Sequence, residues 1–264
     1  MEKIQMLIAT MNNKNAKILY EKMNLTSDAL IINQSDYVAY EKYNVNNSLV
    51  ECYTFNERGL SKSRNNALMR CTGDIICIAD DDMVYTSTYE KDILDEFAKH
   101  PKADAIVFNV ESTNSNRDGK KIKRFKRVGK IESKEYGSVH IAFRRNVLVK
   151  KNVFFDIFFG SGAIYSCGED TIFLKDIIDK GAKLYKSPIN IGKVDMGESS
   201  WFNGYNEEYF FNKGALIACM YPHICILLIF IQSIRNSKSK LGSYRKFFQL
   251  YTWYYKGAQD YKKR

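Results

Sequence analysis

The first 110 residues alternate between short apolar runs and longer amphipathic stretches. Apolar runs that suit buried parallel strands cover residues 4–9, 29–32, 49–55, 74–79 and 105–110. Between them, apolar side chains recur at helical spacing over residues 13–24, 60–69 and 87–99. This order predicts right-handed βαβ crossovers and a mostly parallel sheet flanked by helices. In such a sheet the ligand binds beyond the carboxyl ends of the strands.

Residues 111–137 break this alternation. They are rich in Asn, Ser and Lys and include the basic run 120–126, so we expect a solvated excursion from the sheet. A strand at 139–143 and a helix at 170–180 then resume the pattern. A chain of 264 residues is long enough for one sizeable core, and we expect one catalytic domain with additions.

The C-terminal segment has a different pattern. Residues 214–234 contain no Lys, Arg, Asp or Glu, but Pro222 interrupts them, and a membrane-spanning helix needs about 20 mostly apolar residues. Beyond them a stripe at helical spacing comprises Tyr244, Phe247, Phe248, Tyr251, Tyr254, Tyr255 and Ala258. Basic residues accompany this stripe, which predicts a helix lying in an anionic membrane interface. The alternative is a helix packed on the catalytic domain with its aromatic side chains in the core.

The distribution of charge supports the membrane interpretation. The net charge is +10, and residues 210–264 contribute +9 of it, with ten Lys or Arg and one Asp. We expect this tail to meet lipid headgroups rather than nucleic acid, because its aromatic residues follow a helical stripe instead of an open groove. Six scattered cysteines and an N-terminus without a secretion leader favour a reducing, cytoplasmic compartment.

Three consecutive carboxylates form the strongest chemical motif. The apolar run 75–79 leads directly into Asp80, Asp81 and Asp82, which places them at the edge of the sheet where a ligand binds. Carboxylates this close repel one another unless a cation lies between them, and Mg²⁺ or Mn²⁺ prefers such oxygen ligands. The alternative is a solvated acidic turn that caps the next helix.

Two further motifs flank this triplet in the sequence. In the first, Gly59 and Ser61 suit a helix start, while Lys62 and Arg64 bring positive charge that could hold a diphosphate. The alternative is an ordinary basic helix face. In the second, the glycines of residues 160–162 permit close approach to a ligand, and Glu169 and Asp170 open a helix. Acidic residues in a first helical turn are also common partners of the helix dipole.

In their order and spacing, these motifs resemble those of the inverting family 2 glycosyltransferases of GT-A fold. The resemblance covers residues 1 to about 205 and rests on residues 9–12, 58–67, 80–82, 160–162 and 169–170. It is nearest to bacterial enzymes that build capsular or O-antigen repeat units on lipid carriers. It implies an α/β, Rossmann-like GT-A domain with a nucleotide-sugar-binding half at 1–110 and an acceptor-binding half at 111–205. The basic, aromatic helical tail then occupies 206–264.

The resemblance also implies a role for each matching residue. Asp80 and Asp82 would bind Mn²⁺ or Mg²⁺, with Asp82 favoured as the direct ligand, and Asp170 would be the catalytic base. The residues implied in binding the nucleotide sugar are Thr10, Asn33, Gln34, Asp36, Lys62, Arg64, Asp80 and Asp81. Those implied in binding the acceptor are Gly162, Glu169 and Trp201.

The chain departs from the family pattern at two places. Family members commonly have paired Asp after the second strand, one of which binds uracil, whereas this chain has Asn33 and Gln34 there. A UDP-sugar remains the expected donor, although the residues that would bind the base differ. Many relatives also have a His downstream of the Glu-Asp pair. Residues 192–201 contain none, and Asp195 is the candidate substitute.

The predicted function is therefore metal-dependent, inverting transfer of a sugar from a nucleotide sugar to a hydroxyl of a lipid-linked oligosaccharide. The expected location is peripheral, at the cytoplasmic face of a bacterial cell membrane, in cell-surface polysaccharide synthesis. One alternative is a sugar-1-phosphate nucleotidyltransferase, although residues 9–17 lack the glycines of its phosphate loop. Another is a non-catalytic membrane or nucleic-acid adaptor that binds through the tail. The sequence leaves the oligomeric state open.

Overall fold

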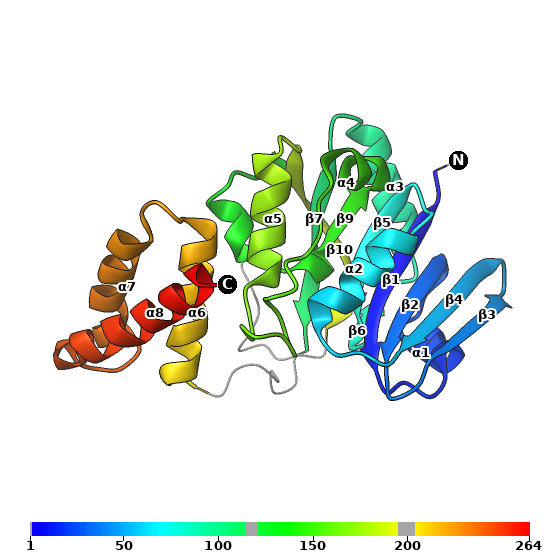
Figure 1. Cartoon of the computed structure of the whole chain (residues 1–264). Helices are drawn as coiled ribbons and strands as arrows, with labels where there is room; N and C mark the ends of the chain where they lie inside the picture. Colours follow the sequence, from blue (N-terminus) through cyan, green and yellow to red (C-terminus); the bar gives the residue numbers. More distant parts are fainter. Residues whose placement is uncertain (1, 114–120, 195–203) are drawn as a thin grey trace.

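The computed structural model describes residues 2–113, 121–194 and 204–264, and within them ten strands form one mixed sheet (Figure 1). The strands are β1 (Ile4–Met11), β2 (Asp28–Gln34), β3 (Ala39–Val45), β4 (Ser48–Phe55), β5 (Ile75–Asp80), β6 (Met83–Tyr85), β7 (Ala105–Ser112), β8 (Lys126–Arg127), β9 (Ile141–Arg144) and β10 (Leu184–Val194). The helices are α1 (Ala16–Lys22), α2 (Leu60–Arg70), α3 (Tyr89–Lys99), α4 (Arg145–Lys151), α5 (Glu169–Asp179), α6 (Glu207–Met220), α7 (Cys225–Ser239) and α8 (Phe247–Lys262).

The order of strands across the sheet is β3-β4-β2-β1-β5-β9-β7-β10-β6, with β8 pairing β10 beside this path. Parallel pairing joins β4, β2, β1 and β5, and also joins β7 to β10. Strand β9 lies antiparallel between β5 and β7, and β3 and β6 are antiparallel at the two edges. The predicted α/β fold is confirmed. The sheet is parallel in its N-terminal half and mixed as a whole.

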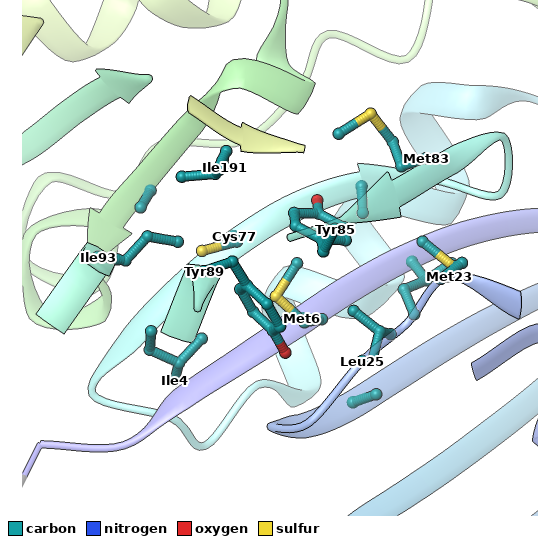
Figure 2. Packing of buried hydrophobic residues seen from close by; sticks show 14 of the residues in the cluster. Ile4, Met6, Met23, Leu25, Cys77, Met83, Tyr85, Tyr89, Ile93 and Ile191 are labelled. Carbon is teal, nitrogen blue, oxygen red and sulfur yellow. The ribbon is translucent and has the colours of Figure 1, made fainter. Parts of the chain in front are cut away.

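Helices cover both faces of the sheet, which accounts for the continuous apolar runs of its central strands. In β1 the side chains of Met6 and Ile8 pack into one core cluster and that of Leu7 into another on the opposite face. Figure 2 shows the first cluster, where Tyr89 of α3 and Cys77 of β5 lie beside Met6. Burial on both faces fixes the register of these strands, because a shift of one residue would move every side chain to the wrong face.

Three C-terminal helices form a separate unit beside α5 (Figure 1). Helices α6 and α8 cross with their backbones in contact at Gly214 and Gly257. A Cβ atom added to Gly214 would lie 1.9 Å from the Tyr254 carbonyl oxygen, and one added to Gly257 would lie 1.9 Å from that of Phe211. Neither position therefore accommodates any side chain. Within the described part of the chain, no helix is both long enough and apolar enough to cross a bilayer.

The helical unit also contacts the segment that leads into α5. Asn212 of α6 donates from Nδ2 to the Ser166 hydroxyl at 2.7 Å, and the Tyr165 hydroxyl donates to Asp260 of α8 at 2.7 Å. An apolar cluster joins the two parts and contains Phe159, Tyr165, Ile172, Ala215, Leu216 and Met220. The unit thus supports the backbone that precedes Glu169 and Asp170.

Candidate active site

Several polar residues of the predicted site lie at one edge of the sheet. Parallel register pairs Thr10 with Asn33 and Ala9 with Asp80, so β1, β2 and β5 end together. The turn after β5 then carries Asp81 and Asp82 along the same edge. This is the edge at which parallel α/β sheets bind their ligands.

Arg64 of α2 lies between the two groups of carboxylates. Its side chain is 4% exposed, and its Nη2 donates to Asp80 Oδ1 at 3.0 Å while Nη1 donates to Asp170 Oδ1 at 2.8 Å. Glu169 Oε1 lies 3.6 Å from the same Nη1. The guanidinium carbon also lies 5.3 Å from the centre of the Phe155 ring. One buried cation therefore holds two carboxylates, Asp80 and Asp170, that lie far apart in the sequence.

The charge of Arg64 is maintained by its partners. Burial alone would favour the neutral guanidine, but the three neighbouring carboxylates outweigh this effect and hold the pKa of Arg64 above its ordinary value. An uncompensated cation at such a site would be strongly unfavourable, and the hydrogen-bonded carboxylates of Asp80 and Asp170 compensate this one. The sequence had predicted Arg64 beside the nucleotide, and the structure gives it these carboxylate partners at the same edge of the sheet.

The three consecutive aspartates have different surroundings. Asp80 is 34% exposed beside Arg64, while Asp81 accepts a hydrogen bond from the Thr10 hydroxyl at 2.5 Å. Asp82 is exposed. Asp81 and Asp82 line an open pocket of about 330 Å³ together with Asn13, Asn15, Ile18, Leu19 and Lys22. Among the described residues, no group of three or more His, Cys, Asp or Glu side chains is arranged so that it could hold a metal ion.

Asn33 and Gln34, predicted near the nucleotide base, bind neighbouring loops. Asn33 Oδ1 accepts from the Asn13 amide at 2.9 Å, and its Nδ2 donates to the Asn13 carbonyl at 3.0 Å. Gln34 makes the same paired contact with the Gly59 backbone, at 3.1 and 3.2 Å. An aspartate has no donor for these carbonyl oxygens, so the contacts require amides. Asp36, beyond β2, is exposed.

The start of α2 is bound to the glycine segment at residues 160–162. Gly59 and Gly162 have φ values of +125° and +76°, in the region that favours glycine. A Cβ atom on Gly162 would lie 3.3 Å from the Gly59 backbone, and the Leu60 amide donates to the Ser161 carbonyl at 2.8 Å. These glycines therefore permit close approach of two backbones. Gly162 is exposed, as is Lys62 in the first turn of α2, and their predicted ligand contacts remain predictions.

Glu169 and Asp170 occupy the first turn of α5 and differ in exposure. The side chain of Glu169 is 13% exposed and that of Asp170 is 26% exposed. Burial, followed by the charge of Asp170, raises the pKa of Glu169 to about 7, although Arg64 opposes this shift. Asp170 is therefore the more solvent-accessible of the two and is held in place by Arg64.

His140 is a neighbour of Asp170 to which the sequence analysis assigns no role. Its Nδ1 lies 3.2 Å from the Phe108 carbonyl oxygen, and burial lowers its pKa although the Asp170 charge opposes this. His140 ends a short 3₁₀ helix at residues 138–140, before β9. Asp170 lies in a different helix much later in the chain, so no local sequence pattern indicates that the two are neighbours. Trp201, predicted on the acceptor side, and Asp195 lie outside the described residues.

We expect Glu169→Gln to stabilise the protein at pH 8 and to change its stability little at pH 5. The folded chain binds the Glu169 proton more tightly than the unfolded chain, because the folded pKa is about 7 against an ordinary 4.5. The free energy of folding that this tighter proton binding contributes is complete below pH 4.5 and is lost as the pH rises through 7. Urea unfolding should show a gain of about 1–3 kcal/mol at pH 8. Exposed Glu21→Gln is the control, and an equal gain at both pH values would contradict the assignment.

The comparisons with known proteins agree with this architecture. Residues 35–166, half of the chain, match the family model described as Glycosyl transferase family 2. The matched region includes α2, the three aspartates and the glycine segment, and it ends shortly before Glu169. No curated protein matches the chain.

Solved structures with low sequence identity share the fold. One is S. aureus TarS 1-349 in complex with UDP-GlcNAc, at 12% identity and a TM-score of 0.64, with 99% of this chain and 92% of that chain covered. Another is the mannosyltransferase PcManGT from Pyrobaculum calidifontis in complex with GDP-Man and Mn²⁺. It has 13% identity and a TM-score of 0.51, and the match covers 98% of this chain and 74% of that chain.

Proposed function

The chain belongs to glycosyl transferase family 2, and from this premise we propose that it transfers a sugar from a nucleotide-diphosphate sugar to an acceptor hydroxyl, with inversion at the anomeric carbon. The observation that carries the proposal is the shared contact of Arg64 with Asp80 and Asp170. Through this contact Arg64 holds Asp170, the candidate base, beside Asp80 at the edge of the sheet. Both solved structures of similar fold are complexes with nucleotide sugars, which supports a donor of this class.

Asp170 is the proposed catalytic base. Its carboxylate takes the proton of the acceptor hydroxyl as that oxygen attacks the anomeric carbon, and the bond to the diphosphate breaks in the same displacement. Arg64 fixes the orientation of Asp170 through the hydrogen bond that its Nη1 donates to Oδ1. Glu169, with a pKa of about 7, is the weaker candidate because it is the more buried of the two and lies 3.6 Å from Arg64 Nη1, against 2.8 Å for Asp170.

The proposed metal ion is Mn²⁺ or Mg²⁺, held by Asp82 and Asp80. Their carboxylate oxygens suit a hard cation, and with so few protein ligands the donor diphosphate and water would complete the shell. When bound, such an ion neutralises negative charge on the leaving diphosphate. The mannosyltransferase relative contains Mn²⁺, which supports this part of the proposal.

For the donor we propose a UDP-sugar bound along the ends of β1 and β2. Thr10, Asn33 and Gln34 form the buried wall of this edge, where the amide contacts of Asn33 and Gln34 fix the adjacent loops. Asp36 and Lys62 are exposed beside it and are the proposed polar contacts to the nucleotide.

For the acceptor we propose a lipid-linked oligosaccharide in bacterial cell-surface polysaccharide synthesis, at the cytoplasmic face of the membrane. The acceptor would approach Asp170 along Gly162 and Glu169, with Trp201 as a further contact. The charge of +9 carried by residues 210–264 supports a site of action at an anionic surface.

A thermal-shift screen of nucleotide sugars with and without Mn²⁺ tests the proposed function. We expect one donor to raise the melting temperature by about 5 °C or more at saturating concentration, because a ligand that binds the folded state stabilises it. Asp82→Ala should abolish the part of the shift that depends on Mn²⁺. Asp95→Ala, an exposed change on α3, is the matched control. Stabilisation by none of the nucleotide sugars would contradict the proposal.

A further inference from the structure

Helix α7 has two faces of opposite character. Cys225, Ile229 and Ser233 are buried against the other helices of the C-terminal unit. The opposite arc is apolar and exposed, with exposed fractions between 40% and 58% for Ile224, Ile226, Leu227, Phe230, Ile231 and Ile234. Large apolar side chains scattered singly over a surface are ordinary, but five on one helix with Ile224 at its N-cap form a contiguous strip that needs a partner.

The strip continues onto the start of α8. The Phe230 ring centre lies 5.4 Å from that of Phe247, which lies 5.1 Å from that of Phe248. Phe248 is 78% exposed. We call the surface of Leu227, Phe230, Ile231, Ile234 and Phe248 the α7 face. Figure 1 shows α7 on the side of the helical unit that is away from α5.

Basic side chains border the α7 face. Arg235, Lys238, Arg245 and Lys246 are exposed beside it. Over residues 209–259 the chain has seven Lys or Arg and no Asp or Glu. Within the described part of the chain, Arg235, Arg245 and Lys246 form no ion pair with an acidic residue. An apolar strip with an unopposed basic border is complementary to the interface of an anionic bilayer.

We infer that the α7 face is the surface by which this protein binds anionic membranes, with α7 lying in the plane of the interface. The apolar side chains enter the boundary between headgroups and acyl chains, and the basic side chains contact lipid phosphates. The inference rests on the proposed function, in which the acceptor is held by a membrane. It places the binding surface mainly on α7, because Tyr254 and Ala258 of the aromatic stripe are core residues of the helical unit, and of that stripe only Phe248 belongs to the α7 face.

The basic residues beside the α7 face disfavour a second copy of this chain as its binding partner. A symmetric dimer through the α7 face would place the same patch on both subunits, and so bring Arg235, Arg245 and Lys246 of each copy toward those of the other. No acidic residue of 209–259 is present to compensate. A bilayer that contains phosphatidylglycerol supplies both the apolar phase and the negative charge.

Vesicle co-sedimentation of the full chain tests the inference. We expect binding to vesicles that contain phosphatidylglycerol, much weaker binding to pure phosphatidylcholine, and weaker binding at high salt. Leu227→Gln/Ile231→Gln and Arg245→Gln/Lys246→Gln should each reduce vesicle affinity about tenfold or more. Ile131→Gln, at a position 84% exposed outside the α7 face, is the matched control and should bind as the native chain does.

Donor binding measured without vesicles, by thermal shift, separates this inference from the proposed function. All five substitutions lie on the surface, so the variants should bind the donor as the native chain does. Loss of vesicle affinity with donor binding intact supports the inference even where no acceptor is identified. Equal affinity of native and Leu227→Gln/Ile231→Gln chains for anionic vesicles overturns it. A concentration-dependent dimer that this variant abolishes, without native binding to vesicles, overturns it in favour of a second copy.

Discussion

Replacing Asp170 by asparagine is expected to reduce release of nucleoside diphosphate from the donor by about 10²–10⁴-fold, the usual contribution of a general base. The amide oxygen of asparagine can still accept the hydrogen bond that Arg64 Nη1 donates to Asp170 Oδ1 at 2.8 Å, so the local structure should persist. An amide cannot take up the proton of the acceptor hydroxyl. Donor binding, measured by thermal shift, should therefore remain while turnover is lost.

Asp176→Asn is the matched control for this experiment, because Asp176 lies on the same helix α5 but outside the site. It should retain the native rate. Full turnover by Asp170→Asn would refute the assignment of the base, and in that case Glu169 would become the candidate to test.

Replacing Arg64 by methionine is expected to cost about 3–5 kcal/mol of unfolding free energy at pH 7, in the range for breaking a buried ion pair. Methionine approximates the length of the side chain, but it leaves Asp80, Glu169 and Asp170 close together without a cation. The remaining carboxylates repel one another less when they are protonated. The loss should therefore be smaller in urea unfolding at pH 4.5 than at pH 7.

Arg70→Met provides the control on the same helix. Arg70 lies over the rings of Tyr53 and Phe55 and donates to Asn66, but it has no carboxylate partner in the described structure. Its replacement removes packing and hydrogen bonds to neutral acceptors, so the cost should be smaller and nearly independent of pH. If Arg64→Met lowered the unfolding free energy by the same amount at pH 4.5 and pH 7, repulsion between the carboxylates would not be the cause of the loss.

The central strands could be predicted from the sequence because they are buried on both faces, which makes their residues continuously apolar. The strands that were missed have a different environment. Strand β3 lies at the edge of the sheet, where Tyr40 and Lys42 face solvent, and a turn with Asn46 at φ +55° leads back into β4. Strand β10 contains Pro188 and shifts its register against β7, so its pattern has no regular period.

The positions of Asp80 and Asp170 in the fold could be predicted because each has a recognisable local signal, an apolar strand before Asp80 and a helix start at Asp170, while their roles stay predictions. Their common partner, Arg64, could not be predicted. The hydrogen bond from Arg64 to Asp170 joins residues 106 positions apart, and no local pattern encodes such a contact. The amide contacts of Gln34 could not be predicted for a similar reason, since they are made to the backbone amide and carbonyl of Gly59, and every residue except proline has both groups.

The apolar cluster between the helical unit and the catalytic part determines what shortening the chain can reveal. A chain that ends at residue 213 would lose Ala215, Leu216 and Met220, and would leave Phe159 and Tyr165 facing water just ahead of Asp170, the proposed base. Such a protein would lose sugar transfer and membrane binding together, because the deletion removes both the α7 face and the helices that support the segment before Asp170. The two activities are therefore separable by point changes on the surface of α7, whereas deletion of the tail confounds them.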